Sequence, residues 1–157
     1  MRTAVLAAVL ALAPLAACDS AGGGSHVTSG TVTFSIEQGV DFYSGQVVDH
    51  ANYQNADLIG TSSGTGVKLA TGGPSPTENR PVNWFLGTGG VHQTFASLAE
   101  VPTTRPDSTM TASLVKAKAG NGFVLEAHGG AYVHGWIQSA DGQTVTIQFE
   151  AAPAELE

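Results

Sequence analysis

The chain has 157 residues, a formal net charge of −7 and a single cysteine. This length is typical of one domain, and a single cysteine excludes an internal disulfide, so burial and backbone pairing must hold the fold. Thirteen acidic residues against six basic ones argue against a nucleic-acid partner, because phosphate contacts need clustered cations. The same acidity argues against direct binding to anionic lipid headgroups.

The first eighteen residues have the three parts of a secretory signal. Arg2 precedes an apolar run over residues 4–13, and Pro14 interrupts that run before the small residues Ala16 and Ala17. A permanent transmembrane helix needs about 20 apolar residues, so this run is too short to span a bilayer. We therefore expect residues 1–17 to be removed.

The segment Leu15-Ala16-Ala17-Cys18 resembles the lipobox of bacterial lipoproteins. The resemblance implies cleavage between Ala17 and Cys18, a diacylglyceryl group on the Cys18 thiol and acylation of the new amino group. Each buried CH₂ contributes about 0.8 kcal/mol, so several acyl chains anchor a protein stably. This lipid is the only non-protein group that we expect. The alternative is an ordinary secreted protein with an unpaired thiol beside its cleavage site.

The residues after Cys18 bear on location and domain organisation. In a Gram-negative cell, Asp19 resembles the signal that retains a lipoprotein in the inner membrane, whereas in a Gram-positive cell it carries no such meaning. We expect the protein on the extracytoplasmic face of a cell membrane. Residues 18–30 are rich in Gly and Ser and predict a flexible tether, followed by a β domain over residues 31–152 and a disordered tail at 153–157.

Strand patterns begin directly after the tether. From Thr31 to Ile36, apolar residues alternate with Thr and Ser, which indicates a half-buried strand. Four further short strands are expected at residues 45–48, 56–59, 66–70 and 82–86, separated by Gly, Pro, Asn and Ser clusters that interrupt helices.

Two segments in the middle of the chain are ambiguous. Residues 91–101 predict one short helix, because Val91, Phe95 and Leu98 have helical spacing and Pro102 follows. Residues 108–119 fit either a capped helix or a strand, and a strand is favoured because a strand array follows.

The C-terminal third predicts three strands at residues 123–128, 131–139 and 144–150, joined by tight turns at 129–130 and 141–142. In the last strand Val145, Ile147 and Phe149 share one face, which should be buried. The sequence therefore predicts an all-β fold: a single antiparallel sandwich or a partly open barrel of roughly seven to nine strands. It should contain a C-terminal three-strand meander and at most one short helix.

Two pieces of the chain, residues 40–45 (VDFYSG) and residues 122–133 (GFVLEAHGGAYV), resemble the HmuY-like lipoproteins. That family implies an all-β surface domain. Some members bind haem through two histidines, but the histidines of this chain do not match those ligand positions, and His128 stands in a turn where the family has Asp-Gly. Only the β-rich lipoprotein architecture is implied.

The segment Gly60-Thr61-Ser62-Ser63-Gly64 matches the G-x-S-x-G pattern of a hydrolase nucleophile elbow. An elbow needs a helix directly after the serine, whereas strand character follows here, so a Gly/Ser-rich loop is favoured. We therefore assign no catalytic residue and expect a protein that is not an enzyme. A small serine hydrolase built on Ser62 is the least favoured alternative.

His128 and His134 could approach each other across the Gly129-Gly130 turn and capture haem or a metal. No cysteine or carboxylate recurs beside them at a ligand spacing. Two ordinary surface histidines are favoured, and no metal ligand is assigned.

Tyr132, His134 and Trp136 share one strand face, close to His128. Such a face is either the second buried side of a sandwich strand or an exposed binding platform. These four residues are the candidate binding residues. The favoured function is a membrane-anchored β domain that binds an unknown protein or small molecule outside the cytoplasm, or packs within an envelope assembly.

Overall fold

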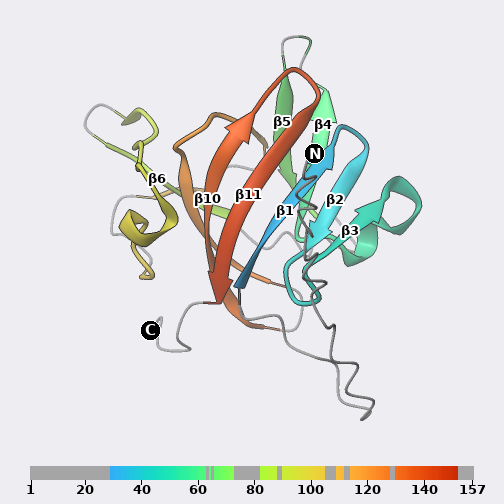
Figure 1. Ribbon diagram of the computed structural model, residues 1–157, viewed down its shortest axis with the longest axis horizontal. Helices are drawn as coiled ribbons and strands as arrows, with labels where there is room; N and C mark the ends of the chain where they lie inside the picture. Colours follow the sequence, from blue (N-terminus) through green and yellow to red (C-terminus); the bar gives the residue numbers. More distant parts are fainter. Residues whose placement is uncertain are drawn as a thin grey trace, which may run out of the picture.

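The computed structural model describes residues 29–62, 64, 66–72, 82–87, 90–104, 109–111, 114–127 and 130–151. These residues form two antiparallel sheets that face each other as a sandwich (Figure 1). The all-β prediction is confirmed, and the sandwich is the form it takes. Over the described ranges, no helix is long and apolar enough to cross a membrane.

The six-stranded sheet has the strand order β1-β11-β10-β9-β6-β7. Its strands are β1 (Ser29–Ser35), β6 (Val82–Phe85), β7 (Thr109–Thr111), β9 (Gly122–Glu126), β10 (Tyr132–Ala140) and β11 (Thr144–Ala151). The predicted meander is present as β9, β10 and β11, and β1 extends it by pairing with β11. β1 begins at Ser29, two residues inside the range predicted as tether.

The five-stranded sheet has the strand order β3-β2-β4-β5-β8. Its strands are β2 (Gln38–Asp41), β3 (Gln46–Asp49), β4 (Leu58–Ser62), β5 (Val67–Thr71) and β8 (Leu114–Lys116), with the 3₁₀ helix η1 (His50–Asn55) between β3 and β4. The sequence analysis missed β2. The described strands number eleven, more than the seven to nine expected, because several are only three or four residues long.

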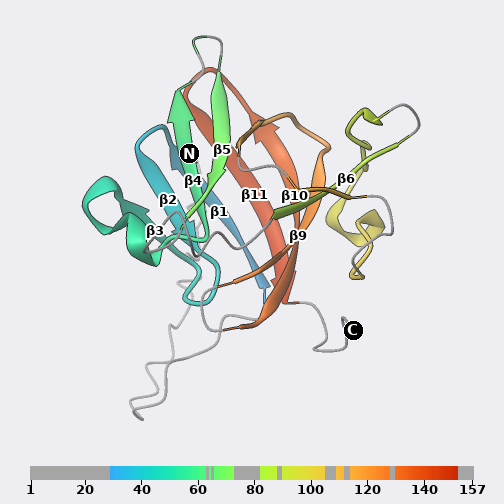
Figure 2. The ribbon, with the colours of Figure 1, turned by 180° about the vertical axis from the view of Figure 1, so that it is seen from behind.

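A tight corner at Ile36 and Glu37 carries the chain from one sheet to the other. The Ile36 N–H donates to Gln143 O at 3.0 Å, and the Glu37 N–H donates to Gly60 O at 2.9 Å. Glu37 has φ 69°, a left-handed conformation that few residues other than glycine adopt. Consecutive residues thus bond to strands or turns of opposite sheets, so the two layers are joined at this edge (Figure 2).

The core between the sheets is built from aromatic rings on both layers. Phe42 lies 4.9 Å from Phe149 and 6.0 Å from Phe123 between ring centroids, and Trp84 lies 5.2 Å from Phe123. Gly135 stands opposite Phe123 in the β9–β10 register, and a Cβ on Gly135 would collide with the Phe123 ring. The glycine therefore makes room for the aromatic ring at the centre of the sheet.

The helix predicted over residues 91–101 is not formed. The segment contains only the 3₁₀ turn η3 (Leu98–Glu100). Its backbone is used otherwise: the Gln93 N–H donates to Phe85 O at 2.9 Å, and the Phe95 N–H donates to Gly120 O at 2.8 Å. These bonds to the six-stranded sheet and its neighbouring turn prevent the i to i+4 pattern of an α-helix.

The strand expected over residues 108–119 is two strands. β7 pairs with β6 in one sheet, whereas β8 pairs with β5 in the other. Within β8 the buried residue is Val115, whereas Leu114, which the alternation grouped with Met110 and Ala112, is 47% exposed.

Candidate functional site

The predicted face of Tyr132, His134 and Trp136 is covered by a segment of the same chain. Residues 90–104, called here the covering segment, lie against the outer side of the six-stranded sheet (yellow in Figure 1). A second hydrophobic cluster fills the space between them: Phe85, Phe95, Leu98, Val101 and Val124, with Tyr132 and Trp136 packed against it. The geometry therefore favours the buried alternative over the exposed platform.

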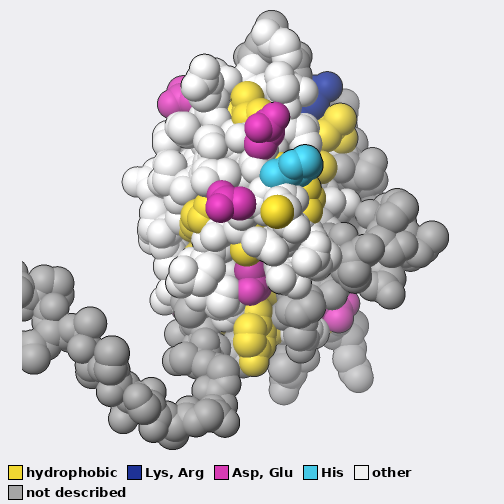
Figure 3. Space-filling model, turned by 90° about the vertical axis from the view of Figure 1, so that its right-hand side faces the viewer, with side chains coloured by type: hydrophobic (Ala, Val, Ile, Leu, Met, Phe, Trp, Pro, Cys, Tyr) yellow, Lys and Arg dark blue, Asp and Glu magenta, His cyan; other side chains and the backbone are white. Residues whose placement is uncertain are grey.

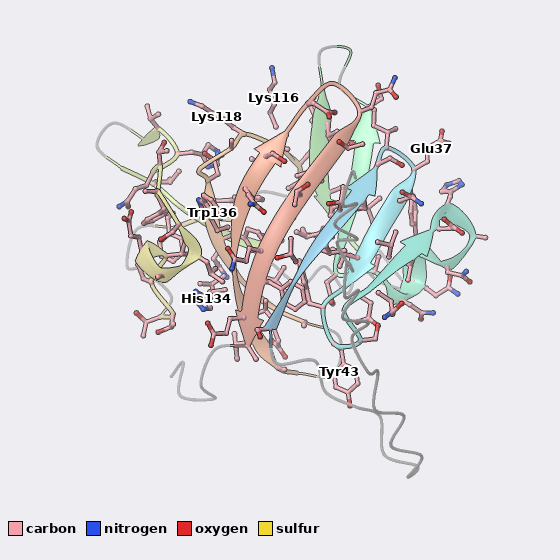
Figure 4. The ribbon with its side chains drawn as sticks, in the orientation of Figure 1. Glu37, Tyr43, Lys116, Lys118, His134 and Trp136 are labelled. Atoms are coloured by element: carbon pink, nitrogen blue, oxygen red, sulfur yellow. The ribbon has the colours of Figure 1, made fainter. Side chains whose placement is uncertain are left out.

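Both polar groups on this face are used inside the domain. The Trp136 indole Nε1 donates to Phe95 O at 3.0 Å, and His134 Nδ1 lies 3.2 Å from Val101 O. Because a carbonyl oxygen can only accept, His134 Nδ1 is the donor in this bond. His134 is 4% exposed, and its Nε2 lies 3.8 Å from Glu150 Oε2. Figure 4 shows both labelled side chains on the side of β10 that faces the covering segment.

The other predicted site residues divide into two groups. Ser62 ends β4 as an exposed residue, and β5 rather than a helix begins at Val67. The nucleophile-elbow geometry is therefore not formed, and the expected loop over residues 60–62 is strand. Ala17, Cys18 and His128 lie outside the described residues, so the lipidation site stays a prediction and the disfavoured approach of His128 to His134 is not tested. The expectation of ordinary surface histidines is wrong for His134, which is buried under the covering segment.

A pocket of about 340 Å³ lies where the chain crosses from the five-stranded to the six-stranded sheet. It is lined by Val91, His92, Lys116, Ala117, Lys118 and Asn121. Volumes near this size are at the lower end of those of small-molecule sites. Two separate parts of the chain, the start of the covering segment and the β8–β9 connection, contribute its walls.

The first wall is a short hairpin that continues β6. Leu86 pairs with His92, and the Gly87 N–H donates to Val91 O at 2.8 Å. The hairpin sets the His92 ring edge-on to the buried Trp84 indole, with ring centroids 5.8 Å apart and an interplanar angle of 85°.

The second wall is a β-turn over residues 118–121. The Asn121 N–H donates to Lys118 O at 3.2 Å, and Gly120 has φ 89°. The third position of such a turn requires a positive φ, which glycine adopts readily. The turn is fixed to β10, because the Gly120 N–H donates to Ile137 O at 2.8 Å and Asn121 O accepts from the Ile137 N–H at 2.9 Å. It therefore holds Lys118 and Asn121 in fixed positions at the pocket.

Two polar atoms of the pocket residues have no hydrogen-bond partner. They are His92 Nδ1 and Asn121 Oδ1, both buried. Trp84 Nε1 is also unpartnered, but Trp84 does not line the pocket. Asn121 is only 2% exposed. Leaving a buried polar group without a partner costs about 1–3 kcal/mol, and two residues that line this pocket each carry such an unsatisfied polar atom.

The charge at the pocket is opposite to that of the whole molecule. The basic side chains of the described part of the chain are Lys68, Lys116 and Lys118, and two of these line the pocket. Figure 4 shows Lys116 and Lys118 pointing outward at one end of the sandwich. Figure 3, which faces the side of β3 and η1, shows acidic side chains near a histidine in the middle of that face and a basic side chain at its upper edge.

Burial, and secondarily the charge of Lys118, lower the pKa of His92 below the ordinary value of 6.5. His92 is therefore neutral near pH 7, and its ring offers one donor and one acceptor. The pocket as a whole offers lysine N–H donors, an amide and a neutral imidazole against the apolar wall of Val91 and Ala117. Such a set can hold a small polar molecule.

The sequence analysis did not identify His92, Lys116, Lys118 or Asn121. One signal was present: two of the three lysines stand two residues apart, just before Gly120-Asn121, in an otherwise acidic chain. Nothing in the sequence indicated that His92 belongs to the pocket, because only the fold brings residue 92 close to residue 121.

No protein-family model matches the chain, and no curated protein or solved structure matches it significantly.

Proposed function

We propose that the protein is a membrane-anchored bacterial lipoprotein whose extracytoplasmic β domain binds a small molecule in the pocket formed by His92, Lys116, Lys118 and Asn121. The anchor rests on the Leu15-Ala16-Ala17-Cys18 segment. The lipid holds the chain at the membrane, and the domain presents the pocket to the surrounding compartment.

The observation that carries the binding role is the group of unpartnered polar atoms at the pocket. Asn121 Oδ1 and His92 Nδ1 are buried without hydrogen bonds, although the backbone around Asn121 is fully engaged in the turn. Because both atoms are almost inaccessible to solvent, a ligand must shift the side chains around them to supply the missing hydrogen bonds and remove their desolvation cost. By contrast, His134 Nδ1 and Trp136 Nε1 both bond to the covering segment.

The test uses the purified full-length protein in detergent micelles, labelled with ¹⁵N. The chain has two tryptophans, so its spectrum contains two indole N–H signals, and Trp136→Phe identifies each. We expect an ultrafiltered small-molecule extract of cells to shift the Trp84 signal, because the Trp84 ring makes a T-shaped contact with His92. The Trp136 signal should move much less, because that indole bonds to Phe95 O.

Asn121→Leu is the matched variant, because it removes the unpartnered oxygen and retains a similar volume. The shift of the Trp84 signal should disappear in this variant. If no extract shifts the wild-type Trp84 signal, the binding role is wrong.

A further inference from the structure

We infer that the open edge of β1 binds an extended, basic segment of a partner protein, which adds one strand to the six-stranded sheet. In this mode of recognition, backbone hydrogen bonds supply the affinity and alternate side chains of the peptide supply the specificity. The edge is separate from the pocket, so this inference goes beyond the proposed small-molecule binding and does not depend on it.

β1 is an edge strand whose backbone groups alternate between β11 and the open side. The Ile36 N–H donates to Gln143 O at 3.0 Å, in continuation of the β1–β11 register. The preceding Ser35 N–H instead donates to Gln38 Oε1 at 3.1 Å. Because alternate residues of an antiparallel strand bond to the same neighbour, the even-numbered residues of β1 bond to β11. The odd-numbered residues therefore direct their N–H and C=O groups away from β11.

Three of these odd-numbered residues, Ser29, Thr31 and Thr33, are exposed, and within the described part of the chain no strand pairs with their open side. Edge strands are commonly protected by shortness, lysine, proline or a bulge. β1 has seven residues, an uninterrupted register and none of these residues. The other edge strands, β3, β7 and β8, have only three or four residues. β1 is therefore the edge best suited to receive a strand.

Val47 on β3 is a second, independent observation. It stands opposite Val40 in the β2–β3 register, and directly opposed residues share one face of a sheet. Val40 is 0% exposed in the core, whereas Val47 is 39% exposed. Both ribbon views show β2 and β3 lying beyond β1 (Figures 1 and 2), so the described part of the six-stranded sheet ends before it covers Val47. A strand added beside β1 would cover this side chain.

Charge specifies the occupant. Residues 29–49, which form β1, β2, β3 and their connections, contain Glu37, Asp41 and Asp49 but no Lys or Arg. Figure 4 shows Glu37 at the β1–β2 corner. On the neighbouring β11, the side chain of Glu150 is 59% exposed. Complementary charge favours Lys and Arg in a partner that approaches this edge.

The same charge argues against a second copy of this chain. Antiparallel pairing of two β1 strands would place β2 and β3 of one copy beside those of the other, and the only charged side chains of these strands are acidic. Such like charges repel one another. The terminal segments of the chain are also poor strand formers, because residues 19–28 are rich in glycine and residues 152–157 contain a proline and two glutamates.

The test uses ¹⁵N-labelled full-length protein in micelles of a nonionic detergent, with amide hydrogen exchange as the readout. The probe is the synthetic peptide acetyl-Lys-Thr-Val-Thr-Val-Thr-Lys-amide. In the free protein, the amides of Thr31 and Thr33 should exchange rapidly, whereas those of Val32 and Phe34 should be protected by β11. Saturation with the peptide should slow the exchange of Thr31 and Thr33 by at least about fivefold, as expected for one hydrogen bond each.

Matched peptides and variants separate the contributions of backbone and charge. A peptide that is N-methylated at its Val and Thr residues cannot donate, and one with Glu in place of Lys has the opposite charge. Both should bind at least about tenfold more weakly. Thr31→Pro removes an N–H that does not bond to β11, and it should weaken binding about tenfold. Thr31→Ala keeps this N–H and should bind like the wild type.

The outcomes are distinct. If Thr31 and Thr33 are already protected in the free protein, the edge is occupied by the chain itself and the inference is wrong. It is also wrong if the peptide does not protect these amides, or if the N-methylated or the acidic peptide binds as tightly. Protection of these amides that is lost in Thr31→Pro and kept in Thr31→Ala supports the inference. If Thr31→Pro does not fold, the peptide comparison decides.

Discussion

His92 illustrates at the scale of a single residue how the fold sets a charge state. Burial is the larger cause of its lowered pKa, and the Lys118 charge is the smaller one. We therefore expect Lys118→Gln to raise the pKa of His92 but to leave it below 6.5. A pH titration of the His92 ring proton by NMR measures this, and Lys68→Gln should leave the midpoint unchanged. A His92 pKa at or above 6.5 in the unliganded wild type would contradict the assigned causes.

The same shift has a consequence for stability. Since the pKa of folded His92 is below the value of 6.5 expected for the unfolded chain, the unfolded chain binds the proton more readily. The contribution of His92 to the free energy of unfolding is thus present above pH 6.5 and is lost as the pH falls towards the lowered value. His92→Gln should remove this component from the pH dependence of denaturant midpoints.

The covering segment is the element whose packing connects the domain core to the pocket. Phe95 contacts Phe85 edge-on, with ring centroids 5.7 Å apart, and the bridge between Thr94 and Asn121 joins the segment to the pocket turn. We expect Phe95→Ala to lower the free energy of unfolding by about 3 kcal/mol, the lower end of the range for truncating a buried phenylalanine. The loss should be local, because this cluster is separate from the main core.

Amide hydrogen exchange measures that local loss. In Phe95→Ala, the amides of residues 93 and 95 should exchange faster. Ligand binding should also weaken, because His92, which lines the pocket, lies next to residue 93 in the same segment. Amides in the β1–β11 ladder should be affected much less. Val91→Ala, at an exposed position, is the control and should change stability by less than about 0.5 kcal/mol. Equal acceleration in all strands would show that the segment does not open separately from the main core.

For the whole molecule, the proposed lipid anchor makes membrane attachment depend on one residue. We expect Cys18→Ser to abolish lipid attachment, because serine lacks the thiol that accepts the diacylglyceryl group, and to leave an uncleaved or soluble product. Metabolic labelling with a radioactive fatty acid and membrane fractionation measure the two effects. Ser20→Ala is a nearby control that should keep the label. Label retained by Cys18→Ser would falsify the lipoprotein assignment.

Local alternation was sufficient to predict much of the fold. The residues Val32 and Phe34, or Val145, Ile147 and Phe149, are buried on one face as expected, because side chains of a strand alternate between its two faces. The covering segment was misjudged for the opposite reason. Its apolar residues have helical spacing, yet its backbone N–H groups donate to the carbonyl oxygens of residues 85 and 120. Both residues lie outside the segment, so the local apolar pattern does not reveal these bonds.

The sequence by itself determined the strand-rich character and the C-terminal meander, because each depends on residues adjacent along the chain. For the same reason it predicts the export and lipid signal. Only the tertiary structure decided that His134 and Trp136 face a covering segment and that His92, Lys118 and Asn121 share a pocket. The physical reason is that a pocket is made by side chains from separate elements. Their convergence depends on sheet pairing and on the crossing between layers, and neither leaves a periodic pattern in the chain.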